Sequence, residues 1–402
     1  MNKVLLINVT CGKGSTGKIV TGIYDRLVAH GYECMIAYGR YDAPKGYNAY
    51  RIGSETDVRI HGILSRITDK QGLYSTAATK KLIKKIEDFN PDIVHLHNIH
   101  GYYLNYKILF EYLKKSDVRV IWTLHDCWSL TGHCTHFEFA RCEKYKTTCG
   151  NCPQLKEYPK SLLCDASKKN HELKYSLFSD MEKMQLVTPS EWLKNIMLCS
   201  FMKKYPINVV PTGIDLEVFK PIESALRKEY QLEDKFIILG VANPWRERKG
   251  LFEFIKLSEK LDDKYKIVLI GLNEEQKKIL PSSIIGLGKT DSIEQMAQWY
   301  STADVYANLT LEDTFPTTNI ESIACGTPVI TYRVGGSAES IDDKTGFAVD
   351  KCKIDEVIEA IKKIESGFIN EQDCIDRAKS YAAEKRFEQY YEEVYKPYEK
   401  AL

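Results

Sequence analysis

The stretch EDTFPTTNIESIACGTPVITYR, residues 312–333, predicts a turn, a helix and a buried strand in immediate succession. Phe315-Pro316 forms the turn, and Thr317-Thr318 are residues that can cap the start of the helix. The first free N–H groups of such a helix would face a phosphate, and Glu321, one turn inside, could accept hydrogen bonds from two ribose hydroxyls. Asp313 would then reach the sugar, so the stretch predicts a nucleotide-sugar site. An ordinary amphipathic helix with solvated acids is the alternative interpretation.

The length and charge of the chain bound its organisation. Its 402 residues are more than a single hydrophobic core usually contains, and they fit two domains of about 200 residues each. The 56 Lys and Arg residues against 55 Asp and Glu residues leave a formal charge of +1, which gives no reason to expect nucleic acid. The run KKLIKKI, residues 80–86, places lysines around a short helix; most such clusters are solvated, and a minority dock on anionic membranes.

The N-terminus and the cysteines indicate the compartment. MNKVLLINVTCGKG has too short an apolar run for a secretory signal and predicts a first strand, and no stretch approaches a membrane span. Twelve cysteines without an export signal indicate free thiols in a reducing cytoplasm. We therefore expect a cytoplasmic protein, with peripheral contact at the inner face of the cell membrane as a further expectation.

Short β-branched runs alternate with helical periods along the chain, which is typical of parallel strands joined by helical crossovers. We expect an α/β fold of two Rossmann-like, doubly wound domains facing a cleft, with ligands beyond the C-terminal strand ends. The domains should span residues 1–207 and 208–377, with a final helix over 378–402 that crosses back onto the first. The expected strands are residues 3–10, 33–39, 92–98, 118–126, 184–190, 236–243, 265–272, 283–288, 304–310 and 328–333, and the main helices of the second domain are 249–261, 292–303 and 317–325.

The loop CGKGSTGK, residues 11–18, follows the first expected strand and opens a helix, so its backbone can approach a phosphate. It matches the dinucleotide-binding pattern GxGxxG, but the second strand ends in Arg40, where that pattern needs an acid. It also matches a P-loop, yet Ile19 stands where a Ser or Thr should bind magnesium. We expect the loop beside a diphosphate, with a simple tight turn as the alternative.

Histidines stand near the ends of two strands that are expected to be neighbours. By alternation, His95 and His97 share one face of their strand, and His125-Asp126 ends the next strand. A lone strand histidine is usually a core residue, and we retain that interpretation for His95. Two histidines near one sheet edge favour a cleft role for His97 and His125.

Basic residues crowd the turn GVANPWRERKGL, residues 240–251, between the first strand and first helix of the second domain. Arg246, Arg248 and Lys249 could neutralise a departing diphosphate without a metal ion. A solvated basic turn is the alternative, but the place at a strand end favours a functional role. The glycines of RVGGSAESI, residues 333–341, leave room for a base or simply form a turn.

Five cysteines crowd residues 127–152, and four of them form a candidate metal-binding set: Cys134, Cys142, Cys149 and Cys152. The CGNC hook at its end resembles half of a zinc knuckle, and four thiolates could hold a structural zinc ion tetrahedrally. Cys134 and Cys142 are too widely spaced for a typical zinc motif, so four reduced thiols without a metal are an equally good interpretation. No pattern supplies an open metal position, so we expect no catalytic metal.

Taken together, these motifs resemble family 4 glycosyltransferases over nearly the whole chain. The likeness rests on residues 14–18, the HxHN run at His95, HD at His125, TGID at Thr212, RKG at Arg248, DTFPTTNIE and ACGTPV. It is nearest to bacterial enzymes of capsule, exopolysaccharide and colanic-acid synthesis, which share NIHGYYLN and the cysteine segment. The resemblance implies the GT-B architecture and a retaining, metal-independent transfer of a hexose-type sugar from a UDP- or GDP-sugar to a glycan or lipid-linked saccharide.

The resemblance also implies residue roles. Glu321 corresponds to the ribose ligand, Asp313 to the donor-sugar contact, Lys249, with Arg248 beside it, to the phosphate-binding lysine, and His125 to the histidine facing the donor sugar. The other donor-side residues are Gly14, Thr16, Gly17, Arg246, Phe315, Pro316, Thr317 and Thr318, and the acceptor side includes His97, Asn98 and Asp126.

Two departures from the family pattern stand out. The family's acidic pair usually reads Glu and Glu, whereas here its first position is Asp313, with Glu312 beside it, so either of these two acids could meet the sugar. Asn243 stands where many members have an arginine, so Arg246 or Arg248 must supply the second cation.

Three alternatives to a transferase remain open from the sequence. A nucleotide-sugar epimerase of the same fold would need acid and base carboxylates at the sugar. An NAD(P)-dependent oxidoreductase would bind its cofactor at the loop of residues 11–18. A non-catalytic sugar-binding protein would need no catalytic residues. By analogy, acceptor contacts are expected in residues 51–82.

Overall fold

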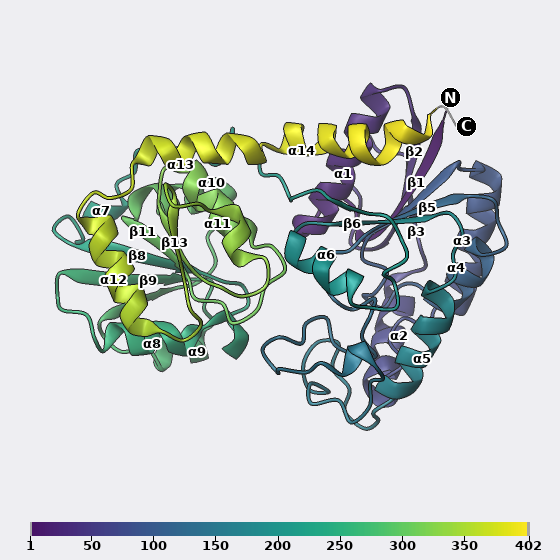
Figure 1. Ribbon diagram of the computed structural model, residues 1–402, viewed down its shortest axis with the longest axis horizontal. Coiled ribbons are helices and arrows are strands. Elements are labelled where there is room, and N and C mark those ends of the chain that lie inside the picture. Colours follow the sequence, from purple (N-terminus) through teal and green to yellow (C-terminus); the bar gives the residue numbers. More distant parts are fainter. Residues whose placement is uncertain (1, 400–402) are drawn as a thin grey trace. The chain divides into compact units, whose positions relative to one another are not determined.

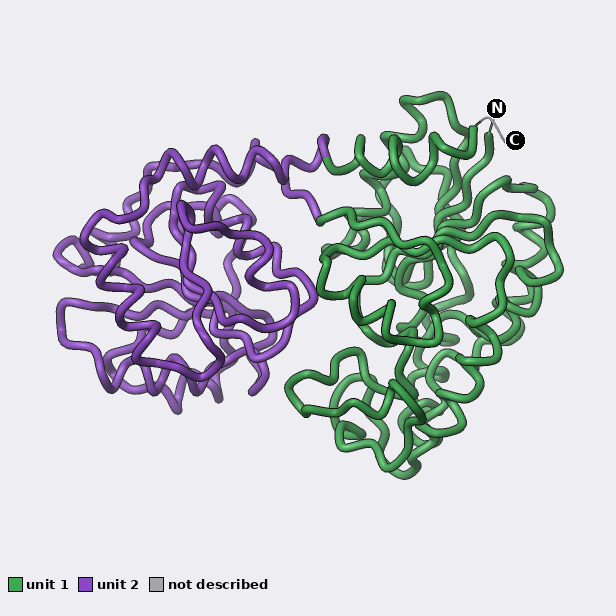
Figure 2. Tube along the Cα trace, in the orientation of Figure 1, with its two compact units in different colours: residues 1–211, 386–402 green, residues 212–385 purple. Residues whose placement is uncertain are grey.

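The computed structural model describes residues 2–399 and divides the chain into two compact units (Figure 2). Unit 1 comprises Met1–Pro211 and Arg386–Leu402, and unit 2 comprises Thr212–Lys385. The chain therefore leaves unit 1 a few residues after position 207 and re-enters it after position 378. Within residues 2–399, every helix is too short or too polar to cross a membrane.

Unit 1 is built on a parallel sheet, seven-stranded over the described residues (Figure 1). Its strands are β1 (Lys3–Thr10), β2 (Glu33–Arg40), β3 (Ala49–Arg51), β4 (Ile93–Leu96), β5 (Arg119–Thr123), β6 (Met184–Thr188) and β7 (Ile207–Val209). They stand in the order β3-β2-β1-β4-β5-β6-β7. The edge strands β3 and β7 were not expected, because three residues are too few to show a pattern.

Alternate residues of each strand face opposite layers of helices. Val4 and Leu6 belong to the core under one layer, while Leu5 and Ile7 belong to the core under the other. The first layer is α1 (Gly14–Ala29) with the C-terminal tail, and the second contains α2 (Glu55–Thr68), α3 (Thr76–Phe89), α4 (Tyr106–Leu113), α5 (Ser167–Phe178) and α6 (Glu191–Leu198). This burial on both faces explains the continuous apolar strands.

The C-terminal tail completes the first of these cores. It runs as α14 (Ala383–Tyr390), a π-helical turn (Tyr391–Tyr395) and a 3₁₀ turn (Lys396–Tyr398), so the single helix expected over 378–402 is wrong as far as residue 399 and lies outside the described residues beyond it. The Tyr395 hydroxyl lies 2.5 Å from Nδ1 of His95, and the Thr123 hydroxyl lies 2.8 Å from Nε2. His95 is fully buried with both ring nitrogens bonded, which confirms it as a core residue.

Unit 2 repeats the architecture with a parallel sheet of six strands in the described chain. The strands are β8 (Phe236–Val241), β9 (Tyr265–Ile270), β10 (Ile284–Leu287), β11 (Val305–Asn308), β12 (Val329–Tyr332) and β13 (Gly346–Val349), in the order β10-β9-β8-β11-β12-β13. The helices are α7 (Leu226–Glu229), α8 (Leu251–Ser258), α9 (Glu274–Lys278), α10 (Ile293–Thr302), α11 (Thr317–Ala324), α12 (Ile354–Glu365) and α13 (Glu371–Ala378).

Both sheets have the strand order of dinucleotide-binding folds, which confirms the expected pair of Rossmann-like α/β units. In each sheet the first three strands run from the centre to one edge, and the chain then returns to the centre and adds the remaining strands toward the other edge. The neighbours β1 and β4 in unit 1, and β8 and β11 in unit 2, are the points where the order reverses. Ligands of such sheets bind where the loops diverge at these points.

Gly250 sets the start of α8, which begins at Leu251 and not at the expected position 249. The residues before it form a 3₁₀ turn, Glu247–Lys249, and Gly250 has φ +81°. A Cβ at this position would lie 2.0 Å from the carbonyl oxygen of Leu309. Only glycine therefore lets the loop after β8 approach the loop after β11 so closely.

We predict that Gly250→Ala destabilises the protein by at least ~3 kcal/mol, because it adds a backbone collision to a left-handed φ. Gly367→Ala is the matched control, since Gly367 has φ +79° and a Cβ there would meet no atom within 4 Å. The control should cost about 1–2 kcal/mol, the left-handed penalty alone. Urea denaturation monitored by circular dichroism measures both, and equal losses would contradict the prediction.

Candidate active site

The loops that follow β8 and β11 are bonded to each other at the reversal point of unit 2. The N–H of Leu311 donates to the carbonyl of Arg248 at 2.7 Å, and the Thr310 hydroxyl donates to the same oxygen at 3.2 Å. These bonds place the basic turn at residues 246–249 directly beside the acidic pair at 312–313.

Two ion pairs join the turn to the acids. Nζ of Lys249 lies 2.5 Å from a carboxylate oxygen of Asp313, and Nε of Arg248 lies 3.8 Å from one of Glu312. The Lys249 and Asp313 side chains are 25% and 19% exposed, whereas the Glu312 side chain is 3% exposed. Of the two acids, Asp313 is thus the one that a ligand can reach with little rearrangement.

Gly335 holds the Asp313 loop from its other side. A Cβ on Gly335 would lie 1.7 Å from the Asp313 carbonyl oxygen, and the N–H of Gly336 donates to that oxygen at 3.2 Å. The glycine pair therefore serves close backbone packing, which explains the turn interpretation of residues 333–341. Asn243 and Arg246 lie on the loop after β8, where both side chains are exposed.

Helix α11 begins at Thr317, and its N-cap residue is Pro316. The expected capping role of Thr317-Thr318 is therefore wrong, because both threonines already lie inside the helix. Instead, the Thr317 hydroxyl donates to Oε1 of Glu321 at 3.1 Å, one turn further along. Proline has no N–H and fixes φ, so the helix can begin directly after the Phe315 turn.

Tyr300 is a partner of Glu321 that the sequence did not reveal. Its hydroxyl donates to Oε2 of Glu321 at 3.0 Å, from helix α10. Burial, followed by the Glu321 charge, holds the pKa of Tyr300 well above its usual value, so it remains a donor. Both oxygens of Glu321 are thereby fixed in direction, one turn inside α11.

In unit 1, Asn8 ties the glycine loop to the end of β4. Its Nδ2 donates to the carbonyl of Thr10 at 2.8 Å and lies 3.4 Å from the Thr16 hydroxyl, and its Oδ1 accepts from the N–H of Asn98 at 3.2 Å. Gly17 lets α1 pack closely, since a Cβ there would lie 2.7 Å from Thr10 Oγ1. Asn8, which the sequence analysis missed, thus brings Thr16 and Asn98 together.

His125 lies just beyond β5 and is supported by His97. Nε2 of His125 lies 3.1 Å from Nδ1 of His97, and the rings stack with centroids 5.4 Å apart. His97 is 1% exposed, so it lies beneath His125 and not at the surface, while His125 is half-buried. Burial lowers the pKa of His125 to about 4, although the Asp126 charge opposes the shift. His125 is therefore a neutral imidazole at neutral pH.

Asp126 is held by His100, another residue that the sequence analysis missed. Nε2 of His100 lies 2.9 Å from one Asp126 oxygen, and the N–H of Trp128 donates to the other at 2.9 Å. Burial works to raise the pKa of Asp126, but the charge and hydrogen bond of His100 outweigh it and lower the pKa to about 2. The Asp126 carboxylate is ionised and fixed, so it is a rigid part of the strand end.

Comparisons with known proteins identify the family of the chain. A family model described as "Glycosyltransferase Family 4" matches residues 16–218, and one described as "Glycosyl transferases group 1" matches residues 223–381. The chain belongs to glycosyltransferase family 4. The family 4 enzyme is thus a transferase, and the comparisons favour neither an epimerase nor an oxidoreductase.

Relatives of this family 4 chain include two named for surface polysaccharides. It is 25% identical over 286 residues to the "Putative colanic acid biosynthesis glycosyl transferase WcaC" of Escherichia coli K12, covering 68% of this chain and 67% of that protein. It is 27% identical over 214 residues to the capsular polysaccharide biosynthesis glycosyltransferase CapM of Staphylococcus aureus, covering 48% of this chain and 56% of that protein. These names match the enzyme classes that the motifs resemble.

Solved structures confirm the GT-B fold. Sucrose-phosphate synthase from Thermosynechococcus elongatus superposes with a TM-score of 0.74 at 16% identity, covering 100% of both chains. Anabaena HepE in complex with UDP-glucose superposes with a TM-score of 0.64 at 13% identity, covering 97% of this chain and 98% of that chain. At these identities the likeness shows the fold alone.

We predict that stability falls as pH falls from 7 to 5, because buried histidines stay neutral in the folded chain. Burial lowers the pKa of His95 to about 3 and that of His61 to about 4, so below pH 6.5 the unfolded chain binds protons that the folded chain does not. Each such histidine removes about 2 kcal/mol of unfolding free energy between pH 7 and pH 5.

Urea denaturation of wild type and His95→Gln at both pH values tests this prediction. The variant should be less stable at pH 7, yet it should lose about 2 kcal/mol less than wild type on acidification. His61→Gln, which alters the opposite core of unit 1, should show the same reduced pH dependence. A pH dependence identical to that of wild type in both variants would show that these histidines are protonated in the folded protein.

Proposed function

We propose that this glycosyltransferase moves a hexose-type sugar from a nucleotide-sugar donor to a glycan or lipid-linked saccharide in surface polysaccharide synthesis, with retention at the anomeric carbon. The observation that carries the proposal is the Lys249–Asp313 pair at the reversal point of unit 2, beside the start of α11. Relatives named for colanic acid and capsule synthesis support the acceptor class, and the complex of HepE with UDP-glucose supports a nucleotide-sugar donor.

Lys249 and Arg248 provide the positive charge that a departing diphosphate needs. The bond from the anomeric carbon to the diphosphate breaks as the bond to the acceptor oxygen forms on the same face. The acceptor proton passes to a departing phosphate oxygen, so no separate base is needed. Because the two side chains and the α11 N–H groups neutralise the developing charge, we propose that transfer needs no metal ion.

The acids orient the donor. We assign the sugar contact to Asp313 over the buried Glu312, because Asp313 is partly exposed and pairs with Lys249. Glu321, fixed by Thr317 and Tyr300, accepts the ribose hydroxyls. Phe315-Pro316 gives α11 its abrupt start and so exposes the N–H groups of the first helical turn.

On the unit 1 side, His125 contributes a neutral imidazole. With one ring nitrogen engaged by His97, the other can hydrogen-bond a sugar hydroxyl or the anomeric oxygen. Gly14 leaves room beside the loop for a phosphate or an acceptor, Thr16 offers it a hydroxyl, and Gly17 lets α1 pack closely enough to hold the loop in place. His97 contacts His125, Asn98 is linked to the glycine loop through Asn8, and Asp126 follows His125 in the chain.

We predict that Lys249→Ala lowers turnover by about 10²-fold or more, because loss of one charge stabiliser at the leaving group costs that much in comparable sites. Lys256→Ala is the matched control, since Lys256 lies on α8 and pairs with Glu253 away from Asp313. Release of nucleotide from a panel of UDP- and GDP-sugars, followed by mass spectrometry, measures the rates and names the donor. Wild-type turnover in a folded Lys249→Ala would refute the role.

The exposed face of α2 supports contact with a membrane that carries lipid-linked acceptors. Ile60, Ile63 and Ile67 are more than a third exposed on successive turns, with Arg59 and Arg66 exposed beside them. The N–H of Leu162 donates to the Arg66 carbonyl at 2.7 Å, which places the exposed Leu162 and Leu163 beside the end of α2. We name these seven residues the α2 surface, whose apolar and basic side chains suit an anionic lipid headgroup layer. The lysines of residues 80–86 lie on α3, where Leu82 and Ile86 are buried.

We predict that Ile63→Glu with Leu163→Glu reduces binding to vesicles of anionic phospholipid by about tenfold or more, because two apolar side chains no longer enter the lipid. Ile279→Glu is the control, since Ile279 is equally exposed but lies in unit 2. Flotation with vesicles at two ionic strengths measures the bound fraction. Equal binding by all three proteins would remove the α2 surface from the proposal.

A further inference from the structure

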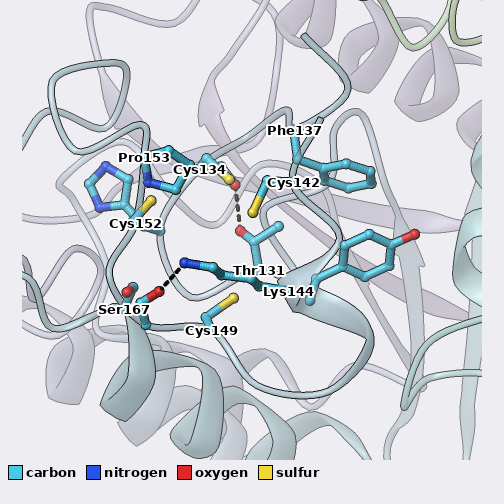
Figure 3. Close-up of a pocket in the computed structure, with 12 residues that line it drawn as sticks. Thr131, Cys134, Phe137, Cys142, Lys144, Cys149, Cys152, Pro153 and Ser167 are labelled. Atoms are coloured by element: carbon cyan, nitrogen blue, oxygen red, sulfur yellow. Dashed lines mark hydrogen bonds between the residues drawn. The ribbon is translucent and has the colours of Figure 1, made fainter. Parts of the chain in front are cut away.

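The cysteines of residues 134–152 gather around one small cavity outside the proposed transfer site. Cys134, Cys142, Cys149 and Cys152 all line it, together with the packed rings of Phe137 and Tyr145 (Figure 3). The volume of the cavity is about 20 Å³, enough for one water-sized particle. Four thiols from three separate turns thus border a space that fits a single ion.

The segment that carries these thiols has little regular structure to hold it. Between the end of β5 at Thr123 and the start of α5 at Ser167, the structure assigns a single 3₁₀ turn, Lys144–Lys146. Long irregular segments inside compact units need some other constraint. A cross-link through the cavity would join the turns at residues 131–134, 142–145 and 149–153.

Two groups near the cavity, the N–H of Gly132 and the side chain of Lys174, can stabilise thiolates. The N–H of Gly132 donates to Sγ of Cys149 at 3.2 Å, which is the hydrogen bond that backbone groups give to metal-bound sulfur. Nζ of Lys174 is buried and donates to the carbonyls of Trp128 and Thr131 at 2.6 and 2.9 Å. A protonated Lys174 next to this loop would offset part of the negative charge that a cluster of thiolates carries.

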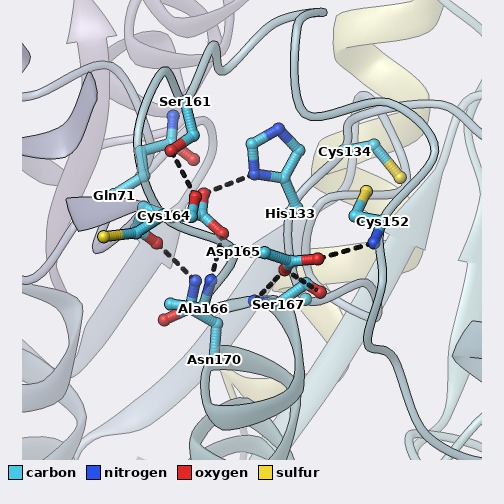
Figure 4. Close-up of polar contacts among 12 residues, drawn as sticks. Gln71, His133, Cys134, Cys152, Ser161, Cys164, Asp165, Ala166, Ser167 and Asn170 are labelled. Atoms are coloured by element: carbon cyan, nitrogen blue, oxygen red, sulfur yellow. Dashed lines mark hydrogen bonds and ion pairs between the residues drawn. The ribbon is translucent and has the colours of Figure 1, made fainter. Parts of the chain in front are cut away.

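Hydrogen bonds outside the cavity fix two of its walls. The N–H of Cys152 donates to Asp165 at 2.7 Å, and Asp165 also accepts from the N–H of Ser167 at 2.9 Å (Figure 4). Nδ1 of His133 lies 2.5 Å from Asp69, whose other oxygen accepts from the N–H of Ala166 at 2.8 Å. The backbone on both sides of the thiols is therefore anchored to α2 and α5 independently of the cavity.

We propose that Cys134, Cys142, Cys149 and Cys152 bind one structural zinc ion in this cavity. Within residues 2–399 no three His, Cys, Asp or Glu side chains are arranged to hold a metal as they stand, so binding requires the four thiols to move closer together. The four thiols release four protons and form a tetrahedral tetrathiolate of net charge −2. Cys127 and Cys164 lie outside the set, because neither lines the cavity.

Zinc content of the full-length protein tests the proposal. Protein purified without a histidine tag under reducing conditions should contain about one zinc per chain by inductively coupled plasma mass spectrometry. Cys149→Ser and Cys152→Ser should each lower that content at least tenfold, whereas Cys164→Ser, an exposed cysteine of the same segment, should retain it. Retention of zinc by Cys149→Ser would overturn the assignment.

Cobalt substitution keeps the test independent of whether the serine variants fold. Wild-type protein loaded with Co²⁺ should show the intense visible bands of a tetrahedral site and the near-ultraviolet charge transfer of four thiolates. The proposal fails if wild type binds less than about 0.1 zinc per chain after incubation with zinc under argon. It also fails if peptide mapping of anaerobically handled protein finds Cys134 and Cys152 joined as a disulfide.

Discussion

The reversal of strand order between β8 and β11 is the constraint on which the proposed site depends. The connections that follow these two strands turn away from each other. Their loops therefore leave the C-terminal ends of β8 and β11 uncovered. The Lys249–Asp313 ion pair spans these strand ends, and the bond from Leu311 to the Arg248 carbonyl fixes its geometry. A cation held in advance by a neighbouring carboxylate needs little reorganisation when a phosphate arrives.

The strand ends of unit 1 carry different groups, an uncharged His125 and the ionised Asp126. Between β1 and β4, the Asn8 amide bridges the glycine loop and Asn98, and the neighbouring strand end carries an uncharged His125. The candidate cations Arg246, Arg248 and Lys249 all lie in unit 2.

The sequence predicted the elements whose signals are local. The apolar runs of the central strands, the turn at Phe315-Pro316 and the acid-to-acid spacing of Asp313 and Glu321 are all contained in short windows, and the structure places them as expected apart from the helix cap. The contacts of His100 with Asp126 and of Tyr300 with Glu321 could not be predicted, because each joins residues more than 20 positions apart through the fold. The three-residue strands β3 and β7 carry no periodic signal at all.

The tail that closes unit 1 comes from the last part of the chain. Tyr390 and Tyr395 pack in the same core as Val4 and Leu6, and the Tyr395 hydroxyl bonds His95 in the middle of the sheet. During synthesis, the part of this face that the tail covers stays exposed until the ribosome has made all of unit 2. The first half of the protein to emerge is therefore the last to reach its native state, and exposed apolar surface must be protected for the whole of translation.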